Sequence, residues 1–266
     1  MKLEVRSRSA HGTAHATPLL FVHGAWHGAW CWDVHFLDYF AARGWNVHAL
    51  SLRGHGDSEG RDRLRWTRMS QYMEDVAQVA ASLPSPPVVI GHSMGGGVVQ
   101  KYLERHGAPA AALLASMPPS GVWRAVLRVI RRHPASFARM NLQLRMYPMI
   151  ATPALARDWF FSEALPQDAL ARYHAQMQDE AYAGFLDMLL LDRPSPRRVR
   201  SNFAGPMLVL GAEHDAIFGV GEVHATAAAY GTQAVIVPGM AHDVMLEPGW
   251  AVAANHVLGW LARLQL

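Results

Sequence analysis

Cysteine and lysine are nearly absent from this chain of 266 residues, which has one cysteine and two lysines, Lys2 and Lys101. The single cysteine, Cys31, excludes a disulfide within the chain. Because Cys31 lies between two tryptophans, we expect a packed thiol and not a reactive one. The formal net charge is only +3, and the chain has no dense basic stripe. These two observations exclude a nucleic-acid footprint, so we expect no nucleic-acid partner.

Long apolar runs are absent as well. No stretch is long and apolar enough to span a membrane, so we expect no integral membrane association. The first nine residues alternate apolar and polar side chains, without the apolar core that a secretory signal needs. A cytoplasmic location is therefore the default expectation. His11 and His15 show no metal-ligand spacing with an acid, and we expect no metal and no cofactor.

The composition is that of an ordinary globular protein, with 51% hydrophobic and 17% charged residues. This length favours one large α/β domain, or one domain with a smaller insertion. Short apolar runs typical of buried strands occur at 18–22, 45–50, 87–90, 110–115, 206–211 and 234–239. Helical patterns occur at 69–83 and 250–264. Continuous apolar strands that alternate with helices predict a parallel sheet covered on both faces.

The middle of the chain has a different character. Residues 119–202 are rich in arginine, methionine and aromatic residues and lack short β-branched runs. Helical spacing extends over 123–132 and over 168–191. We therefore predict a helical cap over 119–202, inserted into a core formed by 1–118 and 203–266.

The predicted helix at 123–132 carries arginines on one face, namely Arg124, Arg128, Arg131 and Arg132. A solvated face is the simpler interpretation of this pattern. An anionic substrate or an acidic membrane surface is the alternative.

The strongest local signal is Gly91-His92-Ser93-Met94-Gly95, which lies between an apolar strand and a helical segment. A serine flanked by glycines two residues away on each side suits a sharp strand-to-helix turn that presents the hydroxyl at its tip. The turn strains the backbone at Ser93 and brings strand and helix so close that neighbouring side chains must be very small. Ser93 is therefore the candidate nucleophile.

A serine hydroxyl needs a base, and the base needs an acid that orients it. Asp215 follows the strand at 206–211, and His242 follows the strand at 234–239. Both would lie at the carboxyl ends of parallel strands, in the chain order serine, acid, histidine. Glu213 is a rival acid on the same loop and Asp57 a more distant one. Asp215 is preferred because it lies further from the strand end, where a loop can reach His242.

Acyl transfer also needs hydrogen-bond donors for the developing oxyanion. The backbone N–H of Met94 follows the nucleophile and opens a helix, so it is one candidate. The second candidate is the N–H of Ala25, in the loop after the strand at 18–22, where Gly24 lets the backbone turn. His23 could be catalytic, but its place beside this tight turn favours a structural role.

The chain resembles the α/β-hydrolase fold enzymes with a helical cap. The resemblance is carried by His23-Gly24, by Arg53-Gly54-His55-Gly56-Asp57-Ser58, by the serine turn and by the loops of Asp215 and His242. It implies a mostly parallel, eight-stranded type of sheet with helices on both faces and the cap after the sixth strand. It also implies Ser93 as nucleophile, His242 as base and Asp215 as orienting acid.

Candidates for substrate binding come from the loops near the serine and from the cap. They are Trp26, His92, Met140, Leu144, Tyr147, Phe160 and Phe161. Methionine and aromatic side chains suit a pocket for apolar groups of varied shape. Packing between cap and core is an equally good interpretation of the residues in the cap.

The predicted function is that of a serine hydrolase which cleaves a small carboxylic ester or thioester through an acyl-enzyme. Relatives of this fold that use an aspartate nucleophile are excluded by Ser93. Asp243, and no lysine, follows His242, which weighs against a lyase. A cofactor-free lyase, a perhydrolase-like or oxygenase-like enzyme, or a non-catalytic small-molecule receptor stay open as alternatives. The sequence does not define the oligomeric state.

Overall fold

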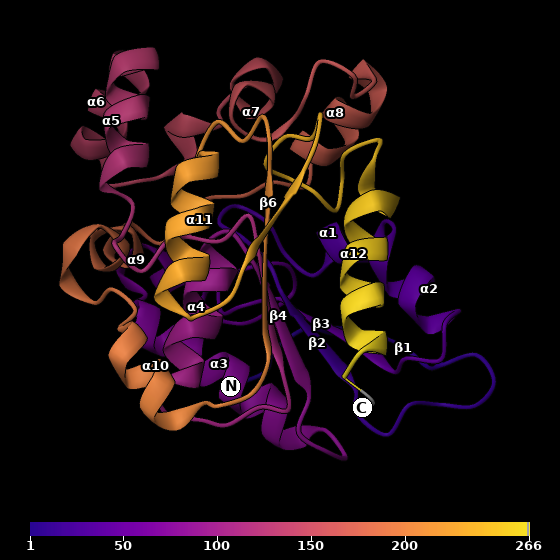
Figure 1. Ribbon diagram of the computed structural model, residues 1–266. Coiled ribbons are helices and arrows are strands. Elements are labelled where there is room, and N and C mark those ends of the chain that lie inside the picture. Colours follow the sequence, from indigo (N-terminus) through magenta and orange to yellow (C-terminus); the bar gives the residue numbers. More distant parts are fainter. Residues whose placement is uncertain (265) are drawn as a thin grey trace.

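The computed structural model describes residues 1–264 and 266 (Figure 1). In this part of the chain one sheet has seven strands, in the order β1-β3-β2-β4-β5-β6-β7. The strands are β1 (Val5–Arg8), β2 (Leu19–Val22), β3 (Val47–Leu50), β4 (Val88–His92), β5 (Ala111–Leu114), β6 (Met207–Ala212) and β7 (Ala234–Val237). Strands β2 to β7 are parallel, and β1 pairs antiparallel with β3.

All six expected apolar runs form strands of this sheet. Every residue of β2, β4 and β5 is buried, as a parallel sheet covered on both faces requires. Phe21 of β2 pairs with Ile90 of β4, and both side chains are fully buried. The centre of the sheet is therefore also the centre of the core. The predicted fold class is confirmed.

The strand count and the place of the insertion differ from expectation. Within the described residues the sheet has seven strands and not eight, and the long helical segment follows the fifth strand and not the sixth. The expected eighth strand came from the family resemblance. The residues themselves supply six apolar runs and β1, whose side chains alternate between exposed and half-buried positions.

Helices cover both faces of the sheet (Figure 1). The core helices are α1 (Trp30–Asp33), α2 (Phe36–Ala41), α3 (Met69–Ser82), α4 (Met94–Leu103), α11 (Val220–Ala229) and α12 (Trp250–Ala262), with a short 3-10 turn, η1 (Arg61–Trp66). Helices α2 and α12 pack together on one face, whereas α3, α4 and α11 lie on the other.

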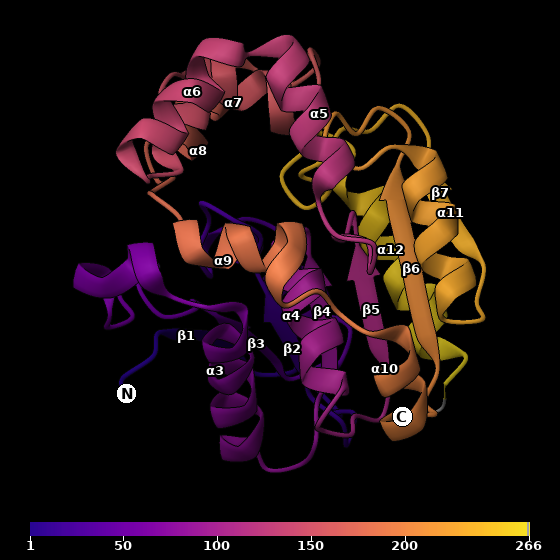
Figure 2. The ribbon, with the colours of Figure 1, turned by 90° about the vertical axis from the view of Figure 1, so that its left-hand side faces the viewer.

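Residues 119–202 connect β5 to β6 entirely through helices and loops. The helices are α5 (Trp123–Arg132), α6 (Pro134–Gln143), α7 (Pro153–Phe160), α8 (Gln167–His174), α9 (Tyr182–Leu186) and α10 (Pro196–Asn202), with short turns η2 (Tyr147–Met149) and η3 (Asp187–Leu191). Figure 2 shows α5 to α8 above the end of the sheet toward which β5 and β6 point. Helix α10 instead packs against α4, low on the core. The division into core and cap stays a prediction.

The helix expected over 168–191 is interrupted. Helix α8 ends at His174 and α9 begins at Tyr182, so residues 175–181 form a loop. This loop turns back toward the sheet, because the backbone N–H of Gln178 donates to the carbonyl oxygen of Trp26 at 3.0 Å.

In the part of the chain that the structure describes, no helix is both long enough and apolar enough to cross a membrane.

Candidate active site

Ser93 lies at the junction of β4 and α4, with φ 53° and ψ −120°. A positive φ is costly for a residue with a Cβ and persists only where the surroundings enforce it. The flanking glycines show how tight the junction is. A Cβ on Gly91 would meet the backbone of Gly95, and a Cβ on Gly95 would meet the carbonyl oxygens of Val22 and His23. The structure therefore has the strand-turn-helix geometry that the glycine spacing predicts.

Asp215 and His242 meet at the carboxyl ends of β6 and β7. Nδ1 of His242 lies 2.7 Å from Oδ2 of Asp215, and both side chains are buried. Oδ1 of Asp215 accepts the N–H groups of Ile217 and Phe218 at 2.7 and 2.9 Å, so the carboxylate is held on both oxygens. Because Nδ1 faces a carboxylate, it carries the hydrogen, and Nε2 is the nitrogen left to act as a base. Nε2 is buried and has no hydrogen-bond partner among the described residues.

The two rival acids lie elsewhere. Glu213 accepts the N–H of Gly239 at 2.8 Å at the protein surface. Asp57 is exposed, and its N–H donates to Glu4. Of the acids weighed from the sequence, Asp215 is the one that the structure brings to His242.

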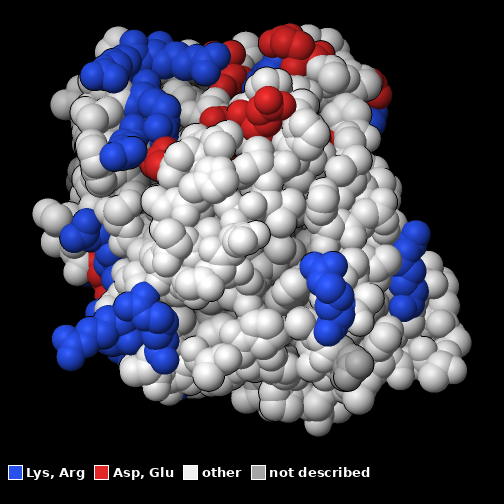
Figure 3. Space-filling view, in the orientation of Figure 1, with Lys and Arg blue, Asp and Glu red and all other residues white. Residues whose placement is uncertain are grey.

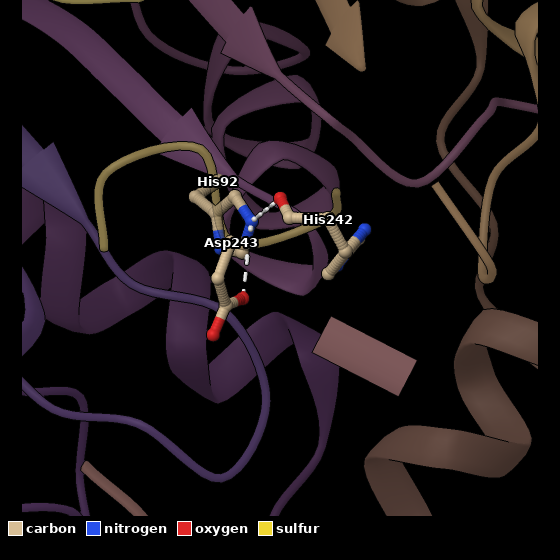
Figure 4. Close-up of side chains that lie close together, drawn as sticks. All are labelled: His92, His242 and Asp243. Carbon is tan, nitrogen blue, oxygen red and sulfur yellow. Dashed lines mark hydrogen bonds and ion pairs between the residues drawn. The ribbon is translucent and has the colours of Figure 1, made fainter. Parts of the chain in front are cut away.

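Two further buried ionisable side chains, His92 and Asp243, lie beside His242 (Figure 4). Nε2 of His92 donates to the carbonyl oxygen of His242 at 3.0 Å and lies 3.7 Å from Oδ1 of Asp243. Oδ2 of Asp243 lies 3.0 Å from Nε2 of His27. Asp243 therefore links the loop of His242 to the loop after β2.

Electrostatics in this group follow from burial and pairing. Burial lowers the pKa of His92 to about 3, and the neighbouring His242 adds to the effect, so His92 is neutral near pH 7. Burial alone would raise the pKa of Asp243, but the charge and hydrogen bond of His27, with smaller contributions from His92 and His242, together outweigh burial and lower that pKa. Burial lowers and Asp243 raises the pKa of His27, with a net upward shift. The arrangement favours an ion pair between His27 and Asp243.

His92, His242 and Asp243 also form the one group of three or more His, Cys, Asp or Glu among the described residues whose ligand-type atoms all lie within 4.8 Å of one another. Their nitrogens already have other roles, since Nε2 of His92 donates to a carbonyl and Nδ1 of His242 faces Asp215. The group therefore gives no separate argument for a metal, and the expectation that none is needed stays a prediction.

The predicted oxyanion donors lie beside Ser93. A Cβ on Gly24 would come within 2.9 Å of the Cβ of Ser93, so the loop after β2 runs directly against the nucleophile turn. Ala25 and Met94 both line the same cavity as Ser93. Among the hydrogen bonds of the described residues, neither the Ala25 nor the Met94 N–H has a protein acceptor. Both groups are thus available to a ligand.

The cavity that contains Ser93 is lined by side chains from the core and from residues 119–202. Its methionines are Met94, Met140, Met146, Met149 and Met188. Its aromatic residues are Trp26, Phe137, Trp159, Phe160, Phe185 and Phe218. Aliphatic side chains such as Val126 and Val129 of α5 complete the wall, and no Asp, Glu, Lys or Arg of the described chain is among the lining residues. The cavity therefore suits an uncharged, apolar group.

The cavity receives three of the seven residues predicted for substrate binding, namely Trp26, Met140 and Phe160. The other four lie outside its lining, and their part in substrate binding stays a prediction. His92 is buried beneath Ser93, where it holds the His242 loop. Leu144, which caps the end of α6, and Tyr147, the first residue of η2, are more than a third exposed. Phe161 follows the last residue of α7 in extended backbone, and its ring packs against Tyr173 of α8 with 6.0 Å between the ring centroids.

The arginine face of α5 is mostly solvated. Basic side chains gather over α5 and α6 at the upper left of Figure 3. Arg124 and Arg131 are exposed, and Arg124 lies over the ring of Trp123. Arg128 differs, because it bonds Glu222 of α11 at 2.5 Å and ties α5 to the core.

Sequence reasoning missed one buried acid near the site, Glu180. It is 1% exposed, lies on the loop 175–181, and accepts hydrogen bonds from Trp26, His55, Tyr72 and Ala181. Burial alone would raise the pKa of Glu180. The charge and hydrogen bond of His55, with the bonds from Tyr72 and Ala181, outweigh burial and lower the pKa to about 2. A glutamate that follows an aspartate within an apparently helical stretch gives no sequence signal of such a role.

The parallel sheet, the serine turn and the loops of Asp215 and His242 are features of one family. A family model described as "Alpha/beta hydrolase family" matches residues 19–254, and the chain belongs to this family.

A monoacylglycerol lipase of Mycolicibacterium smegmatis is 28% identical over 243 residues, which are 85% of this chain and 81% of the relative. A non-heme haloperoxidase of Rhodococcus erythropolis is 39% identical, but over only 38% of each chain. Among solved structures, a thermophilic esterase from Thermogutta terrifontis has a TM-score of 0.70 at 21% identity, covering 99% of this chain and 94% of that one. The structural match shows the shared fold.

Proposed function

We propose that this protein is a serine hydrolase that cleaves carboxylic esters or thioesters through an acyl-enzyme on Ser93. The observation that carries the proposal is the 2.7 Å contact between His242 and Asp215, with Nε2 of His242 left unbonded. A histidine held in one tautomer by a buried carboxylate is the base that a serine nucleophile needs. Ser93 supplies the nucleophile in the wall of an apolar cavity.

In the proposed reaction, Oγ of Ser93 attacks the acyl carbon while Nε2 of His242 takes the hydroxyl proton. The resulting oxyanion accepts hydrogen bonds from the N–H groups of Ala25 and Met94. His242 then gives its proton to the leaving alcohol or thiol. Water attacks the acyl-enzyme with His242 again as the base, and the carboxylic acid leaves.

The substrate class follows from the cavity. Its wall contains methionine, aromatic and aliphatic side chains and no charged residue of the described chain, which supports an apolar acyl group. We propose that α5 to α9 act as the cap, because Val129, Met140, Met149 and Phe185 from this segment line the cavity. A small ester with an uncharged acyl chain fits these features.

A second candidate reaction uses hydrogen peroxide in place of water. The relative named as a non-heme haloperoxidase supports this candidate. On the same acyl-enzyme, peroxide would attack the acyl carbon and release a peroxy acid, with no redox cofactor needed for that step. The lyase alternative has less support, because neither lysine lines the cavity and Lys101 bonds Glu104 and Asp192 instead.

The test is a panel of p-nitrophenyl esters of graded acyl length, with matched thioesters, lactones and one ester of a charged acyl group. We expect turnover of the uncharged esters, a kcat/KM that rises with acyl length and then levels, and rejection of the charged acyl group. Peroxy acid formed in the presence of hydrogen peroxide would support the second candidate. No turnover of any ester or thioester would overturn the proposed function.

A further inference from the structure

The Glu180 carboxylate lies outside the proposed catalytic residues, yet it touches the loop that carries Ala25. Oε2 of Glu180 accepts the N–H of Trp26 at 3.2 Å and faces Nε2 of His55 at 3.1 Å. Oε1 accepts the hydroxyl of Tyr72 and the N–H of Ala181, both at 2.6 Å. Four donors from separate parts of the chain thus fix both oxygens of one buried side chain.

The two peptide units on either side of Ala25 are each held by hydrogen bonds. In the first unit, the carbonyl oxygen of Gly24 accepts from Nδ1 of His23 at 2.7 Å. In the second unit, the carbonyl oxygen of Ala25 accepts from Nδ1 of His27 at 2.7 Å, while the N–H of Trp26 donates to Glu180. A trans peptide is planar, with C=O and N–H pointing in opposite directions. Holding these units therefore sets the direction of the free N–H of Ala25.

The loop would not rest in this shape unaided. Trp26 has φ 66°, a left-handed conformation that is unfavourable for a residue with a Cβ. The hydrogen bonds to Trp26 oppose this cost from both sides, because the N–H of Gln178 also donates to its carbonyl oxygen at 3.0 Å. Both Gln178 and Glu180 belong to loop 175–181, on the segment between β5 and β6.

We propose that Glu180 is a positioning residue that holds the Gly24–Trp26 loop so that the N–H of Ala25 faces the oxyanion formed on Ser93. The proposal rests on the proposed function and deepens it. It makes loop 175–181 part of the oxyanion site. Catalysis then depends on how the segment between β5 and β6 packs against the core, and not only on the core residues.

Glu180→Gln tests the chemistry with little change in size. An amide has one acceptor oxygen where the carboxylate has two, so it cannot satisfy the N–H groups of Trp26 and Ala181 together. Removing an oxyanion donor outright costs about 10²–10³ in kcat in other enzymes. Because the Ala25 N–H is displaced and not removed, we expect kcat to fall about 10- to 100-fold, with KM within about twofold.

The readout specific to this role is binding of a trifluoromethyl ketone, which forms a tetrahedral adduct with an oxyanion on serine. Its affinity should fall by the same factor as kcat/KM, since both report the oxyanion contacts. The matched control is Asp187→Asn. Asp187 is also a buried acid of the same segment, but it bonds Arg68 and the N–H of Met69, away from the loop of Ala25. This control should lose thermal stability and keep kcat and inhibitor affinity.

Tyr72→Phe is the second variant, and it decides the question if Glu180→Gln does not fold. It removes one of the two hydrogen bonds to Oε1 of Glu180 and leaves the carboxylate in place, so kcat and inhibitor affinity should fall together by severalfold. Unchanged kcat and inhibitor affinity in the folded Glu180→Gln variant, or in Tyr72→Phe alone, would overturn the proposal. A rise in KM alone would also overturn it. Wild-type protein without esterase activity would instead count against the proposed function.

Discussion

Several residues at the proposed site have a strained backbone or a side chain fixed by hydrogen bonds, in addition to the role that we propose for them. Ser93 lies at φ 53° and Trp26 at φ 66°, and these two strained positions lie on the two loops that meet at the cavity. Asp215 uses one oxygen to hold its own loop and the other to hold His242. Strain and hydrogen bonding at these residues place groups that would otherwise move, which is the usual basis of preorganisation in a catalytic site.

The acid of the site can be tested by a matched pair of substitutions on one loop. Asp215→Asn should lower kcat by about 10⁴, because an amide cannot hold His242 in the tautomer with Nε2 free. Glu213→Gln should leave kcat within about twofold, since Glu213 lies at the surface, where it accepts the N–H of Gly239 and lies 3.9 Å from Nε2 of His214. Steady-state kinetics on a p-nitrophenyl ester measure both. Equal losses in the two variants would contradict the assignment of Asp215.

His92 should make the fold sensitive to acid. Its pKa is lowered from 6.5 to about 3, so below pH 6.5 the unfolded chain binds a proton that the folded chain does not. The contribution of His92 to stability is thus fully present above pH 6.5 and is lost as the pH falls toward 3. Its slope is at most about 1.4 kcal/mol per pH unit.

Urea denaturation at pH 7, 6 and 5, for wild type and for His92→Gln, isolates this contribution. Titrating groups that do not interact with His92 act alike on both proteins and cancel in the difference. The free-energy difference between the two proteins should shrink as the pH falls. A constant difference would show that His92 titrates alike in both states.

At the scale of elements, helix α4 depends on glycine where it crosses β2. A Cβ on Gly95 would meet backbone oxygens of Val22 and His23, which cannot move without displacing the strand. Gly221 in α11 has open space around its Cβ position. Adding a Cβ should therefore have opposite effects on stability at these two helical glycines, although the sequence alone does not distinguish them.

Gly95→Ala should destabilise the protein by about 1–3 kcal/mol or more, because overpacking against backbone is not relieved by rotamer changes. Gly221→Ala should stabilise it by about 0.5–1 kcal/mol through the lower entropy of the unfolded chain. Urea midpoints for the two variants and wild type give both values. Similar stability of the two variants would contradict the tight crossing of α4 and β2.

An element could be predicted from the sequence when its side chains are apolar and buried along most of its length. The six parallel strands were predictable because each lies within a short, largely apolar run. Strand β1 was missed because its alternating pattern over Val5–Arg8 also suits a solvated terminus. The break at 175–181 was missed because residues 168–191 keep helical spacing throughout, and only tertiary contacts such as Gln178 to Trp26 end α8 early.

At the scale of the whole molecule, the cavity lies between the sheet and the helices that connect β5 to β6. Helix α5 shows this placement clearly, since Val129 lines the cavity and Leu127 is 42% exposed on the outer side. Residues next to the nucleophile could be predicted because turn geometry demands them. The rest of the pocket could not, because whether Met140 or Leu144 faces inward depends on how α6 packs.

The cavity predicts how acyl length affects the rate. Val129→Trp should fill part of it and lower kcat/KM for long acyl esters far more than for acetyl esters. Exclusion of three methylenes corresponds to about 2.4 kcal/mol, or about 50-fold, at about 0.8 kcal/mol each. Leu127→Trp is the control on the same helix and should keep the wild-type profile. The same profile for both variants would contradict the proposed acyl pocket.

Covalent labelling of the protein is the most direct test of whether Ser93 is the nucleophile. The protein is treated with a fluorophosphonate, digested and analysed by mass spectrometry, beside Ser93→Ala. We expect one phosphonyl adduct on the peptide that contains Ser93, and loss of ester turnover in step with labelling. Ser93→Ala should show neither label nor turnover. An unlabelled Ser93 in a protein that still hydrolyses esters, or near-normal turnover by Ser93→Ala, would contradict the role of Ser93 as nucleophile.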